Sequence, residues 1–222
     1  MMKKLLIMGT FLIFMIAQAQ SGITVTGSGT AYGEPDIAII ELGVNIANED
    51  ISTATDEANN SINQIMDVLS QNGIDSKDIR TSYFNIWTEE PYDGQPTRKY
   101  RVNNVLSITV RDVSKVGEVL SRALDAGANM VNSIQYAIAE TDALAAQARE
   151  LAMQNARAKA EQLASLSGVS LGVVEMISDS VSGPSYPEPM YEARAVSGGT
   201  PVSGGQLAVS ATVQVRYTIV NE

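Results

Sequence analysis

Cysteine and histidine are both absent from the 222 residues of this chain. Without thiols and imidazoles, the chain can form no disulfide framework, no Ser-His-Asp triad and no His/Cys zinc site. Enzymatic chemistry would have to use carboxylates, Lys, Tyr or Ser alone. We therefore expect a protein that is not an enzyme, with no catalytic residues, no cofactor and no metal site.

Basic residues are also scarce. The chain has 15 Lys and Arg against 25 Asp and Glu, a formal net charge of −10. Nonspecific nucleic-acid binding needs basic residues that displace counterions from phosphates, and docking on anionic lipid needs a basic patch. The composition therefore predicts no nucleic-acid partner and gives no support for a lipid-surface partner.

Long apolar runs are missing except at the N-terminus. Lys3 and Lys4 precede the apolar segment Leu5–Ile16, and Ala17-Gln18-Ala19 follows as a small-x-small cleavage site. The apolar segment is shorter than the about 20 residues that span a bilayer. We expect residues 1–19 to be a cleaved Sec-type signal peptide, which leaves a mature periplasmic or outer-envelope protein without a transmembrane segment. Loss of the two lysines leaves 13 basic and 25 acidic residues, a net charge of −12.

Strand and helix patterns alternate through the mature chain. Their order is strand-strand-helix-strand-strand-helix-strand-helix-strand-strand, which is typical of an α+β fold. We expect about seven strands in one largely antiparallel or mixed sheet, with three helices on one face and a single domain over residues 20–222. The predicted strands cover 23–26, 38–46, 81–88, 101–110, 133–139, 171–178 and 207–219, and the helices run from about 50 to 73, from about 112 to 127 and from Asp142 to Ser167.

The longest predicted helix, Asp142–Ser167, carries a row of small side chains. Alanines recur every four residues, so they share one side of a helix and permit close packing on a sheet. Gly168 is placed to end the helix in the left-handed conformation. The predicted row consists of Leu144, Ala148, Ala152, Ala156, Ala160 and Leu163.

Glycines interrupt the first predicted strand at Thr26–Gly29. The Gly-x-Gly spacing could suggest a phosphate loop, but a strand pattern follows it where such a loop would open a helix. We interpret the segment as a structural turn or bulge.

Two aromatic segments are candidate interaction sites. Trp87 and Tyr92 lie near the tip of a predicted hairpin, where aromatic side chains suit stacking on a sugar or peptide. Tyr186, Met190 and Tyr191 lie in a Pro-, Gly-, Ser- and Tyr-rich stretch at about 179–205, which we expect to be a flexible loop or arm. Tyr and Met are enriched at protein interfaces, so this arm is a candidate contact with a neighbouring subunit.

Several segments, in order and spacing, resemble the SIMPL-domain family of exported bacterial proteins. The resemblance covers nearly the whole mature chain. Its segments are Ile23–Gly29 with Pro35-Asp36, Tyr100–Val110, Gly127–Asn129 with Ile134, the pairs Ala148-Arg149 and Ala156-Arg157 with Lys159–Glu161, Leu171-Gly172, and Leu207–Tyr217.

The resemblance implies a periplasmic or envelope location without an agreed catalytic set, and in some members self-assembly or a link to oxidative-stress defence. Our first hypothesis is a non-catalytic envelope protein that forms a homo-oligomer. The alternative is a monomeric periplasmic binding module for a small molecule, glycan or peptide. A hydrolase that uses Glu89 and Glu90 is disfavoured, because adjacent residues on a strand point to opposite faces.

Overall fold

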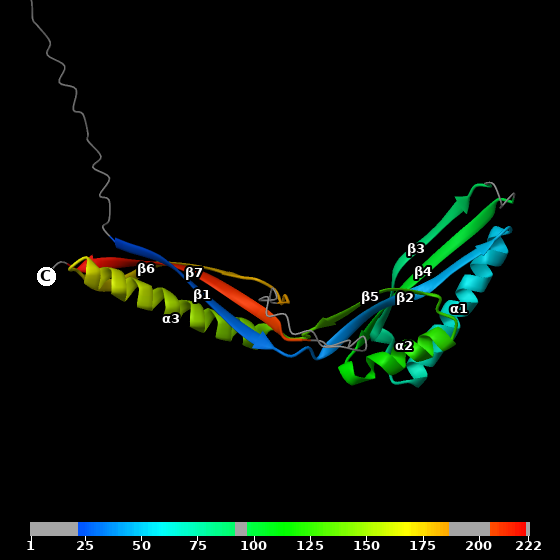
Figure 1. Ribbon diagram of the computed structural model, residues 1–222, viewed down its shortest axis with the longest axis horizontal. Helices are drawn as coiled ribbons and strands as arrows, with labels where there is room; N and C mark the ends of the chain where they lie inside the picture. Colours follow the sequence, from blue (N-terminus) through cyan, green and yellow to red (C-terminus); the bar gives the residue numbers. More distant parts are fainter. Residues whose placement is uncertain (1–21, 92–96, 187–204, 221–222) are drawn as a thin grey trace, which may run out of the picture.

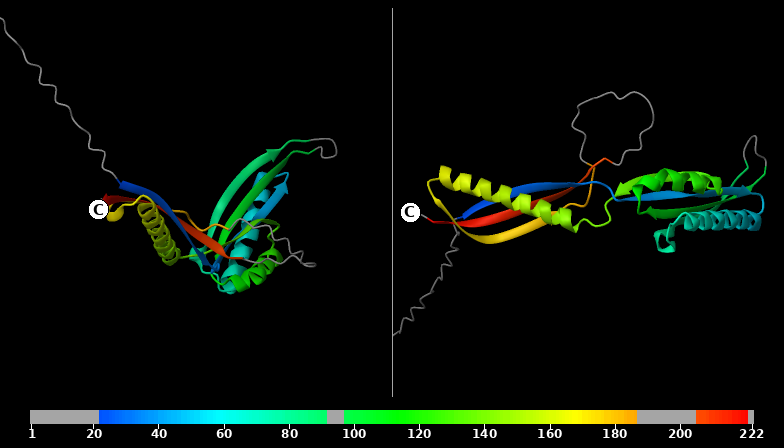
Figure 2. Two further views of the ribbon diagram at one scale, coloured as in Figure 1. Left: turned by 60° about the vertical axis from the view of Figure 1, so that its left-hand side comes forward. Right: turned by 90° about the horizontal axis from the view of Figure 1, so that it is seen from below.

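The computed structural model describes residues 22–91, 97–186 and 205–220. The chain forms two lobes in an elongated molecule (Figure 1). Each lobe has one antiparallel sheet and its own buried cluster. The lobes meet at an angle, so the molecule is bent (Figure 2, left).

The first lobe, called here the α3 lobe, combines both ends of the described chain. Its sheet has the order β1-β7-β6, with β1 at Gly22–Gly33, β7 at Leu207–Val220 and β6 at Ser170–Val181. Helix α3, Asp142–Leu166, lies across one face of this sheet (Figure 2, right). The alternating apolar residues of β7 meet the alanines of α3 in the core.

The second lobe, called here the middle lobe, has a sheet of order β3-β4-β2-β5. Helices α1 and α2 pack on one of its faces and bury the larger core. Short 3-10 turns at Ser76–Asp78 and Val113–Lys115 precede β3 and α2. The bounds are β2 Ile37–Asn48, α1 Ile51–Gln71, β3 Ile79–Glu89, β4 Lys99–Val110, α2 Val116–Asp125 and β5 Met130–Ala137.

The middle lobe is an insertion in the α3 lobe. The chain leaves β1 through the turn before β2 and returns from β5 into α3. Asp36 connects the two segments that run between the lobes. Its N–H donates to the Ala137 carbonyl at 3.1 Å, and its Oδ1 accepts from the Ala139 N–H at 2.8 Å.

Helix ends follow the residues expected for them. Asp50 caps α1 by accepting from the Thr53 N–H at 2.8 Å. Gly73 and Gly168 follow α1 and α3 with φ angles of 84° and 68°, a region that glycine adopts without steric cost.

The α+β class, the seven strands, the three helices and their order are confirmed. The strands are divided between two sheets, whereas we expected one. The alanine row of α3 is fully buried, but Leu163 was wrongly placed on it and is 45% exposed. The cause is the spacing: the buried row continues four residues beyond Ala160 to Ala164, which is 3% exposed, and Leu163 lies beside that row.

Several expected boundaries are wrong. Strand β1 continues through Gly27–Gly29 in regular register with β7, with neither a turn nor a bulge there. The helix expected from about 112 begins at Val116, after a 3-10 turn, and the strand expected at 133–139 is Met130–Ala137.

Strand β6 extends to Val181, past the expected start of the flexible loop at about 179, and residues 187–204 of that loop lie outside the described residues. The expectation of a single domain stays a prediction, and the signal peptide at 1–19 lies outside the described residues.

Candidate functional site

Of the five predicted interaction residues, the structure describes two. Trp87 lies on β3 and is 37% exposed, and Tyr186 follows β6 and is exposed. Tyr92, Met190 and Tyr191 lie outside the described residues. The predicted hairpin is confirmed as β3 and β4, which pair antiparallel.

Trp87 projects from the face of the middle-lobe sheet that no described helix covers. Val102, Leu106 and Ile108 of β4 point into the core under α1 and α2, so the alternate residues point to the other face. Register pairs Trp87 with Arg101 on this side. We call this surface the open face and define it by Tyr83, Asn85 and Trp87 of β3, Arg101, Asn103 and Val105 of β4, and Gly43 and Asn45 of β2.

Three asparagines form a row across the open face. Asn85 of β3 opposes Asn103 of β4, which opposes Asn45 of β2. The side chains of Asn85 and Asn103 make no hydrogen bond to any described residue, and the Oδ1 atom of Asn103 is shielded from water. Asn129 fixes the far end of the row, because it accepts from the Asn45 N–H at 2.8 Å and donates to the Asn45 carbonyl at 3.1 Å.

The one arginine of the open face is paired. Arg101 Nε donates to Glu89 Oε2 at 2.6 Å, and its Nη1 donates to Asn45 Oδ1 at 3.2 Å. Both charged side chains are about one third exposed. The opposite charges of Arg101 and Glu89 therefore cancel locally. The centre of the open face carries amides and aromatic rings without net charge.

Two aromatic rings bracket the row of asparagines. Tyr83 lies two residues before Asn85 on β3, and Trp87 lies two residues after it. The two aromatic positions are therefore about 13 Å apart along the strand. The two rings share a face because they are four residues apart on one strand, a spacing that is visible in the sequence. The sequence did not show the row, because the cross-strand register that joins the three asparagines has no local signal.

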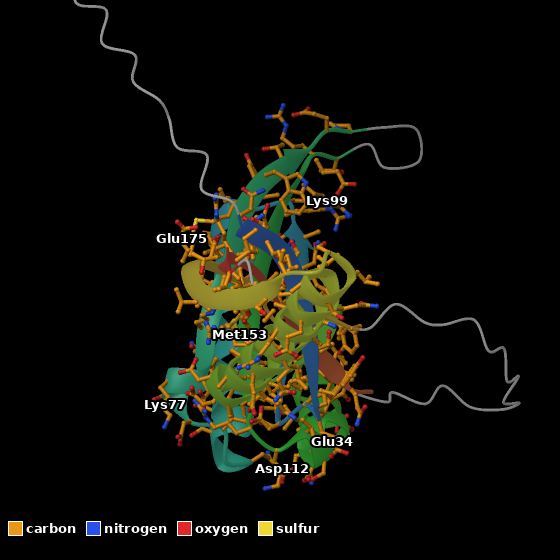
Figure 3. The ribbon with its side chains drawn as sticks, turned by 90° about the vertical axis from the view of Figure 1, so that its left-hand side faces the viewer. Glu34, Lys77, Lys99, Asp112, Met153 and Glu175 are labelled. Carbon is orange, nitrogen blue, oxygen red and sulfur yellow. The ribbon has the colours of Figure 1, made fainter. Side chains whose placement is uncertain are left out.

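A second exposed surface lies on the edge strand β6. We call it the β6 patch and define it by Val173, Val174, Met176 and Ile177, which are between 44% and 73% exposed. Glu175, in the middle of this run, pairs with Arg216 at 2.8 Å (Figure 3). Two register shifts against β7 make the strand irregular here. Alternation in the sequence predicted the strand but not that it would be an edge.

Tyr186 lies where the two lobes meet. Its Oη donates to the Tyr136 carbonyl at 3.4 Å, a long hydrogen bond. A half-open pocket of about 230 Å³ is lined by residues 135–137 of β5, residues 184–186 and Leu207. The pocket is mainly apolar, and no Asp, Glu, Lys or Arg is among the described residues that line it.

The two carboxylates of the disfavoured hydrolase hypothesis are both paired with arginines. Glu89 pairs with Arg101, and Glu90 pairs with Arg98 at 3.1 Å. Across residues 22–91, 97–186 and 205–220, no three Asp or Glu side chains come close enough to share a metal ion. Over the same ranges, no helix has the length and hydropathy to cross a membrane.

Comparison with known proteins gives a family match over most of the chain. The model of the SIMPL family, described as "Protein of unknown function (DUF541)", matches residues 23–217. The match includes every segment that carried the resemblance in the sequence.

Curated relatives match at similar lengths. Uncharacterized protein YggE of Edwardsiella ictaluri (strain 93-146) is 33% identical, over 80% of this chain and 77% of that protein. YggE of Escherichia coli (strain K12) is 32% identical, over 90% of this chain and 83% of that protein. The 26 kDa periplasmic immunogenic protein of Brucella melitensis biotype 1 is 29% identical, over 89% of this chain and 84% of that protein.

Proposed function

The chain belongs to the SIMPL family, and on that premise we propose that it is a non-catalytic envelope protein that associates with further copies of itself. Two observations support an envelope location. One relative carries the word periplasmic in its name, and the first 19 residues have the pattern of a cleavable export signal.

The exposed β6 patch carries the proposal of self-association. Monomeric proteins rarely leave large contiguous apolar patches in water, and such patches mark protein contacts. Four of the five residues from Val173 to Ile177 are apolar and substantially exposed. Register places Val174 and Ile177 on the α3 side of the sheet and Met176 on the other, so the patch wraps around the free edge of β6. The occupant that we propose is a second copy of this chain.

The geometry of β6 indicates how the copies meet. A regular edge strand could add a further strand through backbone hydrogen bonds, but register shifts disrupt this edge. The N–H of Val173 already donates to Thr218 Oγ1 at 3.0 Å. Association therefore uses side-chain packing of the β6 patch. Two further exposed apolar residues lie near the start of β6, namely Leu166, the last residue of α3, and Val220, which pairs with Ser170.

The test is the solution mass of the mature chain from Gln20, measured by light scattering coupled to gel filtration. We expect a discrete oligomer. The double variant Val173→Glu/Ile177→Glu places two charges in the interface and should shift the mass toward the monomer. Leu124→Glu makes the same kind of change at an exposed apolar residue of α2 and should leave the mass unchanged.

A monomeric wild-type chain at micromolar concentration would contradict the assembly and favour the alternative function, a monomeric binding module. The contribution of Tyr186, Met190 and Tyr191 stays a prediction, tested by the mass of a chain in which a short linker replaces residues 186–204. The link to oxidative- or envelope-stress defence also stays a prediction that rests on the family resemblance.

A further inference from the structure

We propose that the open face of the middle lobe binds a neutral glycan chain. The proposal depends on the juxtaposition of Asn85, Asn103 and Asn45 with Trp87 and Tyr83, and it is independent of self-association, because the β6 patch lies on the other lobe.

The asparagine row matches the chemistry of a sugar. Each amide has two N–H donors and a carbonyl acceptor, and each sugar hydroxyl both donates and accepts. Neighbouring strands are about 4.8 Å apart, so the row places three amides over about 10 Å. Asn85 is exposed and has no side-chain partner among the described residues, so its acceptor and donors are both open to a sugar. The Oδ1 atom of Asn103 is buried and that of Asn45 accepts from Arg101, so these two residues offer their N–H groups.

The aromatic rings supply the apolar half of the contact. A pyranose ring has faces of C–H groups, and the face of an aromatic ring is its electron-rich side. Trp87 and Tyr83 flank the row at a separation of about 13 Å. A chain of several sugars, laid along β3, can contact both rings and the amides between them.

Charge and backbone geometry favour a glycan over other polymers. Glu89 pairs with Arg101 at 2.6 Å, so the centre of the face carries no unpaired charge. Register places Lys99 and Arg80 on the same side, one toward each end of the face, so the comparison with heparin tests whether anionic polysaccharides are preferred. An extended peptide is usually held by the free backbone groups of an edge strand. Here β4 and β2 are paired on both sides, so their asparagines offer side-chain groups alone, whereas β3 keeps one free edge.

The single tryptophan makes the proposal directly measurable. Trp87 is the one tryptophan in the chain, so a change in its emission reports on the open face. The mature chain is titrated with chitotetraose, cellotetraose and maltotetraose, and binding is checked by calorimetry. We expect a saturable emission change with at least one of these glycans.

Substitutions in the asparagine row and at Trp87 test whether the measured glycan binding takes place on the open face. Asn85→Ala and Asn103→Ala each remove amide hydrogen bonds and should weaken binding about fivefold or more. Trp87→Ala, measured by calorimetry, should weaken binding about tenfold or more. Asn60→Ala makes the same change as the first two at an exposed position of α1 and should bind as the wild type does.

Circular dichroism checks that each variant is folded, and Asn85→Ala, at an exposed position of an edge strand, serves if Asn103→Ala unfolds. Three results would overturn the proposal. One is no emission change and no heat with any of the three glycans at millimolar concentration. Another is equal binding by Asn85→Ala and Asn60→Ala. The third is binding of heparin in preference to the neutral glycans.

Discussion

At the scale of single residues, Gly27 and Gly29 let β1 lie directly against the backbone of α3. A Cβ atom at Gly27 would collide with the Ala152 carbonyl oxygen, and one at Gly29 would collide with the Ala148 carbonyl oxygen. Both contacts are with helix backbone, which cannot rotate away as a flexible side chain can. The two glycines therefore complement the alanine row on the opposite side of the same interface.

Gly27→Ala should destabilise the protein by about 1–3 kcal/mol, because the added methyl group overpacks a rigid contact. The matched control is Gly117→Ala in α2, where a Cβ would meet nothing within 4 Å. That change should stabilise by about 0.4–1 kcal/mol, since alanine restricts the unfolded chain. Urea unfolding monitored by circular dichroism measures both values. A Gly27→Ala protein as stable as the wild type would contradict the contact.

Asp78 and Arg111 form the most regular ion pair of the middle lobe. Arg111 donates from Nε and Nη2 to the two carboxylate oxygens at 2.8 and 2.7 Å, and the Asp78 side chain is 8% exposed. These hydrogen bonds lower the pKa of Asp78 below its ordinary value. A lowered pKa means that the pair stabilises the fold above about pH 4 and that this contribution is lost as the pH falls through the lowered pKa.

Asp78→Asn should therefore be less stable than the wild type at pH 6, and the difference should shrink as the pH falls through the lowered pKa of Asp78. Thermal melts of both proteins from pH 6 downward measure it. Arg111→Gln removes the other partner and should show the same convergence at low pH. A stability difference that is constant with pH would show that the ion pair does not contribute in this way.

Sequence patterns predicted the residues with local roles and missed those whose role depends on distant parts of the chain. Asp50, Gly73 and Gly168 were assigned to helix ends because capping depends on residues close in the chain. Gly27 and Gly29 were interpreted as a turn or bulge because the reason for them, the α3 backbone, lies more than 100 residues away in the sequence. The asparagine row was missed for the same reason.

At the scale of elements, α3 covers the outer edge of β1 as well as the face of its sheet. Asn155 Oδ1 accepts from the Ser28 N–H at 3.2 Å, and Lys159 Nζ donates to the Thr26 carbonyl at 2.8 Å. Both backbone groups point away from β7 and would otherwise be open to another strand. Protecting an edge strand in this way opposes unwanted pairing.

The double variant Asn155→Ala/Lys159→Ala should expose this edge without disturbing the helix, because alanine favours helices. We expect the Ser28 amide to exchange with solvent deuterium about five- to tenfold faster, the effect of losing one modest hydrogen bond. Gln154→Ala is the control, since Gln154 bonds only to Glu150 within the same helix. Equal exchange in the two variants would contradict the capping role.

The seven strands and three helices were predictable because the periods of two and 3.6 residues are local properties of the sequence, with Gly27–Gly29 of β1 as an exception. The distribution of the strands between two sheets was not. Strand β7 alternates as cleanly as a strand of a single large sheet would, and only the identity of its neighbours, β1 and β6, separates the two arrangements.

At the scale of the whole molecule, the two lobes differ in how they are built from the chain. The middle lobe uses one continuous stretch from β2 to β5, and all four of its strands pair among themselves. Its core draws on residues from Ala38 to Ala128, together with partly buried residues of β5. The α3 lobe needs both ends of the chain.

A fragment of residues 36–138 should therefore fold alone, with a cooperative thermal transition and the helix and strand content of the intact lobe. A chain that stops at residue 206 should retain that transition and lose the α3 lobe, because it lacks β7. Circular dichroism distinguishes these outcomes. An unfolded fragment would show that the middle lobe depends on the α3 lobe and would support the prediction of one domain.

The central position of β7 also sets an order in time. Strand β1 is synthesised first and β7 last, so neither β1 nor the alanine row of α3 can be buried in the α3 lobe until the final strand exists. A chain interrupted before Leu207 therefore leaves an unpaired strand and a helix face of small apolar side chains open to water.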